Sequence, residues 1–213
     1  MTRLSVEEER LLDHAAAAPM LDQVQRWAMI NSGSRNIDGL AHMATMLADA
    51  FSALPGDVTL VDPAPVESVA SDGRVQPLAH GQHLLLSVRP AASTRLLLTG
   101  HMDTVFAIDH PFQNQRWLEP GILNGPGVAD MKGGIAVMLA ALSAMEGTGV
   151  VDHVGYDVVI NSDEEVGSAS SAALLRDRAA GKLAAFTYEP ALPDGTLAGA
   201  RAGSGNFSVI VTG

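Results

Sequence analysis

Short apolar segments that alternate with amphipathic ones constrain the fold of this chain more than any other feature. Three of them, HLLLSVR at 83–89, RLLLTG at 95–100 and VGYDVVI at 154–160, are apolar almost throughout. Strands of this kind occur where a sheet is covered on both faces. Two further strand candidates are DVTLVD at 57–62 and AAFTYE at 184–189.

Helical patterns lie before and between these strand candidates. Three of them precede the first strand, at residues 5–18, 19–30 and 38–54. Two more alternate with the later strands, at residues 133–146 and 168–179. Strands that alternate with helices predict an α/β fold. We therefore expect a three-layer α/β/α domain with a mostly parallel sheet.

Composition and charge exclude several classes of function. The 213 residues carry a net charge of −11, and no basic stripe is present, so we expect no nucleic-acid partner. The absence of cysteine excludes disulfides and thiolate metal sites and fits a cytoplasmic location. The apolar runs are shorter than a membrane span, and the N-terminus lacks the apolar core of a secretory signal, so we expect no membrane partner.

Acidic side chains and one histidine follow three of the predicted strands, although only 17% of the residues are charged. His101 and Asp103 come after RLLLTG, Glu164 and Glu165 after VGYDVVI, and Glu189 after AAFTY. Ligands of open α/β sheets bind beyond the carboxyl ends of the strands. We therefore expect these side chains to lie close together.

Asp130, immediately before an apolar helix, adds a further carboxylate to this set. Clustered carboxylates repel one another unless a cation is present. Imidazole and carboxylates without sulfur suit zinc, manganese or cobalt. In an extended segment Asp103 lies on the same side as His101, so its carboxylate can accept the second imidazole N–H.

Adjacent side chains diverge, so one of Glu164 and Glu165 can bind metal while the other transfers protons. Simpler interpretations exist for each residue taken alone. Asp130 could cap a helix, Glu189 could be a solvated strand end, and the glutamate pair could lie on a surface turn. His80 and His83 have a ligand-like gap, but they precede a strand and are not counted as ligands. The remaining histidines are interpreted as surface or packing residues; they are His14, His42, His110 and His153.

Other catalytic motifs are absent or incomplete. Gly125-Pro-Gly127 precedes a helix, but Asp130 stands where a dinucleotide-binding loop needs its third glycine. No P-loop and no G-x-S-x-G motif occurs, and no thiol nucleophile is available.

Five motifs together resemble one family of metallopeptidases. They are GHMDTVF, NGPGVADMKGG, NSDEEVGS, YEP and RAGSGNFSVIVTG, in this order from roughly residue 27 to the C-terminus. The set resembles the two-zinc aminoacylase and glutamate carboxypeptidase family, which includes acetylornithine deacetylase and succinyl-diaminopimelate desuccinylase. Pro126 makes the chain most similar to the glutamate carboxypeptidase branch, because many relatives have Arg at this position.

The resemblance implies a role for each candidate residue. Asp130 is implied to bridge two divalent metal ions, most simply zinc, with cobalt or manganese as alternatives. His101 and Glu189 complete one metal site, and Glu165 belongs to the other. Glu164 is implied to be the general base. The resemblance also implies that Asp103 orients His101 and that the Asp130–Met131 peptide bond is cis.

The implied reaction is hydrolysis of an amide bond in an N-acyl amino acid or a short peptide. In the family, a lid domain used for dimerisation follows the GSGNFSVIVTG strand, and a later segment supplies a final metal-binding His. We therefore expect residues 1–198 to be the N-terminal part of the catalytic domain and 199–213 the start of a truncated lid. Such a chain should bind metal weakly, turn over little substrate and form a homodimer only with a complete lid. The alternative is a non-catalytic metal- or partner-binding module derived from such an enzyme.

Overall fold

A five-stranded sheet forms the centre of the protein. The computed structural model describes residues 4–149 and 153–197, with single positions at 199, 203, 205, 209 and 211. The strand order is β1-β4-β8-β5-β9. The strands are β1 (Asp57–Val61), β4 (His83–Val88), β8 (Val154–Asn161), β5 (Thr94–His101) and β9 (Ala184–Thr187).

The sheet is mixed: four strands run in the same direction, as expected, but β4 runs against them, which was not predicted. β4 runs antiparallel to both β1 and β8, whereas β5 runs parallel to β8 and β9. The difference follows from the connections. The β2–β3 hairpin (Val66–Val69 and Val75–Leu78) joins β1 to β4, while α4 (Gly134–Thr148) and α5 (Ala172–Ala179) lie in the connections that lead to β8 and β9. Parallel pairing needs such a crossover, and antiparallel pairing does not.

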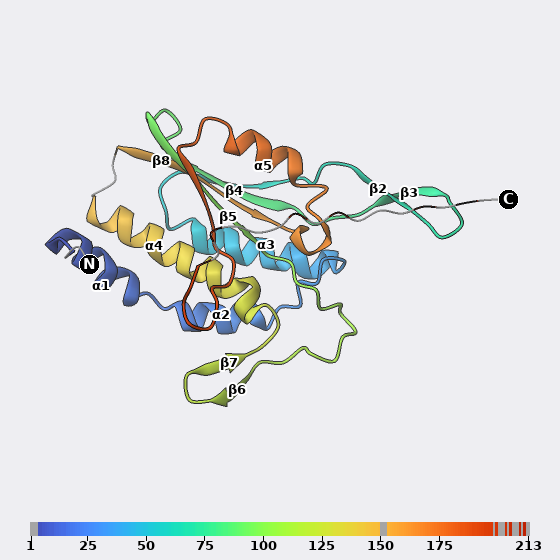
Figure 1. Cartoon of the computed structure of the whole chain (residues 1–213), viewed down its shortest axis with the longest axis horizontal. Helices are drawn as coiled ribbons and strands as arrows, with labels where there is room; N and C mark the ends of the chain where they lie inside the picture. Colours follow the sequence, from blue (N-terminus) through green and yellow to red (C-terminus); the bar gives the residue numbers. More distant parts are fainter. Residues whose placement is uncertain are drawn as a thin grey trace.

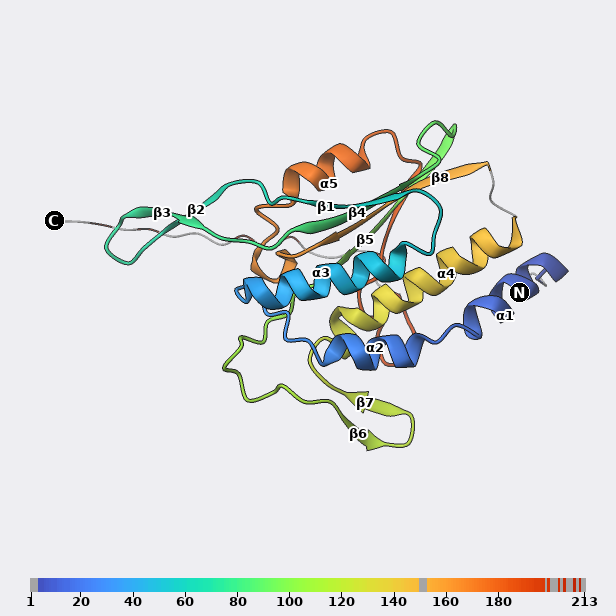
Figure 2. The ribbon, with the colours of Figure 1, turned by 180° about the vertical axis from the view of Figure 1, so that it is seen from behind.

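Helices cover both faces of the sheet, which confirms the predicted layers. Four helices lie on one side of the sheet, and α5 lies on the other (Figures 1 and 2). The four are α1 (Val6–Ala16), α2 (Met20–Ala28), α3 (Ile37–Phe51) and α4. The larger core cluster joins the first side to the sheet. In α3, apolar residues at helical spacing face this core; they are Leu40, Met43, Leu47 and Phe51.

Helix α4 is the most apolar helix of the fold. Together with the turn before it, it forms a stretch of 21 residues, Val128–Thr148, that is long and apolar enough to cross a membrane by length and composition. The expectation that every apolar run is too short was therefore wrong. Half of its most apolar window is buried inside the protein, so core packing accounts for its composition.

Two hairpins were not predicted from the sequence. The β2–β3 hairpin and the β6–β7 hairpin (Arg116–Glu119 and Ile122–Asn124) both project from the body of the protein (Figure 1). All four residues of β6 are exposed, so this strand lacks the apolar pattern of the core strands. The predicted lid strand at 199–213 falls on a segment of which only the five single positions are described, and it stays a prediction.

An ion pair connects the end of β4 to α4. Nη1 of Arg89 donates to Oε2 of Glu146 at 3.0 Å, Nη2 contacts Oε1, and Nε donates to the carbonyl oxygen of Val154 at 2.7 Å. Replacing Glu146 by glutamine should lower the free energy of unfolding at pH 7 by about 1–3 kcal/mol, because Arg89 loses a charged partner.

The loss of stability in Glu146→Gln should depend on pH. The Arg89 guanidinium holds the pKa of Glu146 below its ordinary value of 4.5. The pair therefore stabilises the fold above that value and loses its contribution as the pH falls through the lowered pKa. Urea unfolding should show a difference between wild type and Glu146→Gln that narrows in acid. An unchanged difference at low pH would contradict this role, and the exposed Glu119→Gln serves as the control.

Candidate metal centre

Three neighbouring strands end at one edge of the sheet. His101 is the last residue of β5 and pairs with Asn161, the last residue of β8. On the other side of β5, Thr99 pairs with Thr187 at the end of β9. Residues that follow β8 and β9 therefore lie beside His101, as predicted from the carboxyl ends of the strands.

The buried imidazole of His101 points its Nε2 atom at two carboxylates. Nε2 lies 3.0 Å from Oδ1 of Asp130 and 3.7 Å from Oε1 of Glu189. Nδ1 lies 3.0 Å from the carbonyl oxygen of Asp103 and 3.4 Å from its carboxylate. The nearer acceptor for an Nδ1 proton is therefore the carbonyl, not the carboxylate that the spacing suggested. A proton on Nδ1 leaves the Nε2 lone pair available to a metal ion.

Asp130 lies in an irregular turn between β7 and α4, and its side chain is 54% exposed. Gly133, not Asp130, occupies the N-cap position of α4, and the Asp130–Met131 peptide bond is cis, as the resemblance implied. The turn packs closely against the segment that follows β9. A side-chain carbon added at Gly134 would lie 1.9 Å from the carbonyl oxygen of Tyr188, so only glycine permits this approach.

Glu164 and Glu165 begin the single helical turn Glu164–Val166, just after β8. The buried carboxylate of Asp103 holds this turn. Oδ1 of Asp103 accepts from the Glu164 amide at 3.1 Å, and Oδ2 accepts from the Glu165 amide at 3.2 Å. The hydroxyl of Ser34 also donates to Oδ2, at 2.7 Å. Asp103 thus holds the glutamate pair as well as lying beside His101.

The structure brings five of the predicted site residues within reach of a common metal centre. In each of two groups, every residue offers one ligand atom, and these atoms lie within 4.8 Å of one another. The first group is His101, Asp130 and Glu165, and the second is His101, Glu164 and Glu189. These groups divide the carboxylates differently from the family resemblance. Which carboxylate binds which ion therefore stays a prediction.

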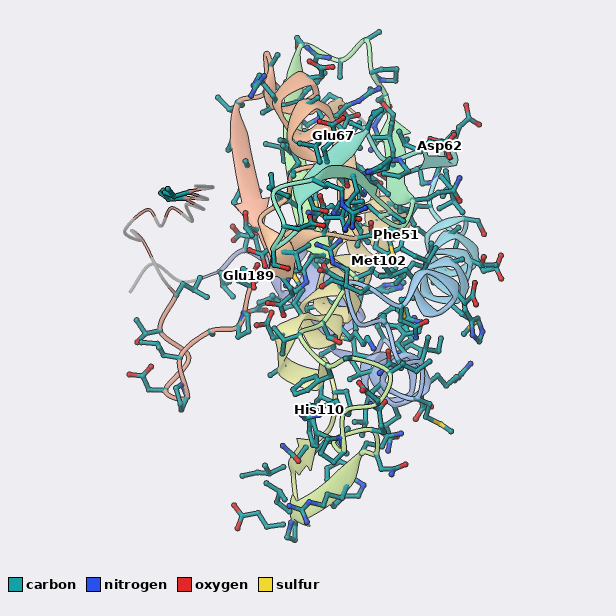
Figure 3. The ribbon with its side chains drawn as sticks, turned by 90° about the vertical axis from the view of Figure 1, so that its right-hand side faces the viewer. Phe51, Asp62, Glu67, Met102, His110 and Glu189 are labelled. Atoms are coloured by element: carbon teal, nitrogen blue, oxygen red, sulfur yellow. The ribbon has the colours of Figure 1, made fainter. Side chains whose placement is uncertain are left out.

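Two of the clustered carboxylates, those of Glu164 and Glu165, hold protons more tightly than usual. Burial and the charge of Asp130 raise the pKa of Glu165 to about 7. Burial also raises the pKa of Glu164, and the nearby charge of Glu189 adds to this effect. Figure 3 shows Glu189 beside the end of β9. Burial, together with like charges at close range, raises the pKa of both glutamates.

His101 also holds its proton more tightly because of these charges. Burial by itself lowers the pKa of the imidazole, but the carboxylates of Asp103 and Glu189 outweigh it and raise the pKa to about 11. Without a cation, protons supply the positive charge that the site lacks. A divalent cation would supply it instead, and one imidazole with several carboxylates fits zinc, manganese or cobalt.

The other histidines are packing or surface residues. His83 is buried and accepts a hydrogen bond from the amide of Ser162 at 3.2 Å, and burial lowers its pKa. His80 lies 3.1 Å from Nη1 of Arg35. In Figure 3, His110 lies on the loop that leads toward the β6–β7 hairpin, away from Glu189. The exposed histidines are His14, His42, His110 and His153.

Two supporting residues were missed by sequence reasoning. Ser34 contacts Asp103 from 69 positions away, and no local pattern signals such a contact. Lys132 is buried, and its Nζ donates to the carbonyl oxygen of Ile30 at 2.9 Å. Burial lowers the pKa of Lys132 to about 8. Its position two residues after Asp130 was the only available signal.

Comparison with protein families matches residues 97–203 to Peptidase family M20/M25/M40. This match covers half of the chain and includes every predicted site residue. The chain belongs to this family. Members of the M20 family are zinc-dependent hydrolases, and the His, Asp and Glu residues described above are candidate metal ligands in this M20 chain.

Individual relatives agree with this assignment. The chain is 29% identical to carboxypeptidase G2 from Pseudomonas sp. (strain RS-16) over 198 residues, 89% of this chain and 43% of that protein. Its fold is similar to that of human carnosine dipeptidase 1, with a TM-score of 0.62 and 22% identity over 83% of this chain and 38% of that one. The M20 metallo-carboxypeptidase Sso-CP2 from Sulfolobus solfataricus gives a TM-score of 0.63 and 17% identity over 83% and 39%. This M20 chain thus spans less than half of the length of these relatives.

Proposed function

We propose that this chain is the metal-binding part of a hydrolase that cleaves an amide bond in an N-acyl amino acid or a short peptide. The observation that carries the proposal is the convergence of His101 and four carboxylates at one sheet edge, with ligand atoms within 4.8 Å in each group. The family supports hydrolysis as the reaction, and the names of carboxypeptidase G2 and carnosine dipeptidase 1 favour small peptide-like substrates.

We assign the two metal ions as the family resemblance implies. His101, Asp130 and Glu189 would hold one ion, and Asp130 with Glu165 would hold the other. Zinc is favoured, with cobalt and manganese as alternatives. Divalent cations at such a site supply Lewis acidity, which lowers the pKa of water and polarises a carbonyl group.

Glu164 is assigned as the general base. Its side chain is exposed, whereas that of Glu165 is half-buried, so it is the member of the pair that solvent and substrate reach more easily. Its raised pKa suits a group that takes a proton from water and passes it to the leaving amine. Asp103 supports this role by holding the backbone amide of Glu164.

Domain organisation belongs to the same proposal. Residues 1–198 would form the N-terminal part of the catalytic domain, and 199–213 would begin a lid through which a homodimer could form. A non-catalytic module that binds metal or a partner is the alternative.

Release of the amine product tests the proposal. The purified chain should be assayed on N-acetyl amino acids and on dipeptides with a C-terminal glutamate, after chelation and after addition of Zn²⁺ or Co²⁺. Metal-dependent release, even at a low rate, supports the hydrolase. Metal binding without release supports the non-catalytic module, and a chain that binds neither ion contradicts both.

A further inference from the structure

The loop at 161–171, which carries Glu164 and Glu165, is folded around one buried carboxylate. Asp163 has no exposed surface. Its Oδ2 accepts hydrogen bonds from the amide of Ser170 at 2.7 Å, the hydroxyl of Ser170 at 2.8 Å and the amide of Ser171 at 3.3 Å. Its Oδ1 accepts from Nδ2 of Asn161 at 3.1 Å. Asp163 thus connects the start of the loop to its end.

The backbone of Asp163 closes the same loop. Its carbonyl oxygen accepts from the amide of Val166 at 3.3 Å and from the amide of Ser168 at 2.7 Å. Gly167 and Ser168 have positive φ angles of 95° and 55°, which turn the chain back toward Asp163. The short turn that carries the glutamates therefore lies within a ring of hydrogen bonds.

A second set of contacts fixes this ring to the sheet. Nδ1 of His83, the first residue of β4, accepts from the amide of Ser162 at 3.2 Å, and the hydroxyl of Ser162 donates to the carbonyl oxygen of Gly81 at 2.7 Å. The hydroxyl of Ser170 lies 3.4 Å from Nε2 of His83. The loop is thereby tied to a strand of the core.

The hydrogen bonds leave Asp163 suited to positioning rather than to binding metal. Both carboxylate oxygens point at donors inside the loop. Asp163 is in neither metal-ligand group found in the described part of the chain, and it forms none of the ion pairs found there. Its charge is balanced by hydrogen-bond donors, which makes the loop conformation dependent on it.

Such positioning is needed because the glutamates face other carboxylates. Repulsion from Asp130 and Glu189 favours movement of Glu164 and Glu165 away from the site when no cation is present. A metal ion then binds only the fraction of molecules that hold the ligands in place, and its apparent affinity falls by that fraction. Asp103 holds the turn from one side, through the two glutamate amides.

We propose that Asp163 is a positioning residue whose buried carboxylate holds Glu164 and Glu165 toward the metal centre before any metal binds. This inference rests on the proposed function. The structure places Asp163 inside the loop and Asp103 outside it, so the glutamate turn is held between two buried carboxylates.

Asp163→Asn tests the proposal with little change in volume. The amide nitrogen must face either the donors of Ser170 and Ser171 or that of Asn161, so at least one hydrogen bond is lost. We expect the affinity for Co²⁺ and Zn²⁺ to fall about 10- to 100-fold, the range typical of residues that support metal ligands. Visible absorption of Co²⁺ and calorimetry with Zn²⁺ measure this change. Both should be recorded well below the melting temperature of the variant.

Asp157→Asn is the matched control. Asp157 lies on β8, the strand that precedes the loop, is also buried, and accepts from Oγ of Ser87 and Nζ of Lys182 at 2.7 Å each. In the described part of the chain its side-chain hydrogen bonds go to Ser87 and Lys182 and not to the loop, so its loss should lower stability while metal affinity stays within about twofold. Equal losses of metal affinity in both variants would show a general effect of destabilisation and overturn the proposal. Unchanged affinity in Asp163→Asn would overturn it as well.

A second variant and a metal-free measurement keep the test decisive. Ser170→Ala removes one donor to Asp163 and should give a smaller loss of affinity of the same kind, even if Asp163→Asn folds poorly.

Hydrogen exchange of the Glu164 and Glu165 amides in metal-free protein should accelerate in both Asp163→Asn and Ser170→Ala but not in Asp157→Asn. Accelerated exchange in a protein that binds no metal would support the positioning role and reject the proposed function. Unchanged exchange would reject the positioning role itself.

Discussion

Replacing Asp130 with alanine should lower the affinity of the protein for Zn²⁺ by at least about 100-fold. Loss of a residue that only supports a metal ligand costs about 10- to 100-fold, and Asp130 is placed as a ligand itself. It lies 3.0 Å from Nε2 of His101 and shares a ligand group with Glu165. Its removal deprives both proposed ions of a carboxylate.

The exposure of Asp130 makes the result easy to interpret. Its side chain is 54% exposed, so the alanine variant should keep the stability of the wild type within about 0.5 kcal/mol. Calorimetric titration with Zn²⁺ measures the affinity, and thermal unfolding checks the fold. Asp109→Ala, at an exposed position outside the ligand groups, should bind Zn²⁺ like the wild type. An Asp130→Ala variant with unchanged affinity would show that the metal centre lies elsewhere.

Glu164→Gln and Glu165→Gln should impair different properties: the first should impair hydrolysis, and the second should impair Zn²⁺ binding. If Glu164 is the general base, its glutamine variant should bind Zn²⁺ normally, and metal-dependent hydrolysis should fall by about 100- to 10,000-fold. Glu165→Gln should instead weaken Zn²⁺ binding at least about tenfold, because an amide is a poorer ligand than a carboxylate.

The comparison matters because the geometry alone permits another assignment. Glu164 shares a ligand group with His101 and Glu189, just as Glu165 shares one with His101 and Asp130. Calorimetry on both variants decides between the assignments independently of turnover. Weaker Zn²⁺ binding in Glu164→Gln than in Glu165→Gln would reverse the two roles.

Much of the local structure could be predicted because each core element carries its own burial pattern. The apolar run at 154–160 corresponds to β8 (Val154–Asn161), and the periodic segment at 38–54 corresponds to α3 (Ile37–Phe51). The exposed hairpins carry no such pattern and were missed. β6 in particular has no buried residue.

The convergence of the candidate site residues could also be predicted from the sequence. His101, Glu164 and Glu189 each follow a predicted strand, and the carboxyl ends of neighbouring parallel strands meet at one edge. The motif order supplied Asp130 and the cis bond that follows it. The first inference needs only the residue types and their distance from the nearest strand, whereas the cis bond was implied by the family resemblance.

The sequence by itself determined the elements and the residue types at their ends, because both depend on neighbours within a few positions. Tertiary structure alone decided the antiparallel direction of β4, the approach of Ser34 to Asp103, and the closure of the 161–171 loop around Asp163. These features join segments through space or through a single buried acceptor. Their formation depends on which donors the folded chain brings within hydrogen-bonding distance, and no periodic pattern along the sequence records that.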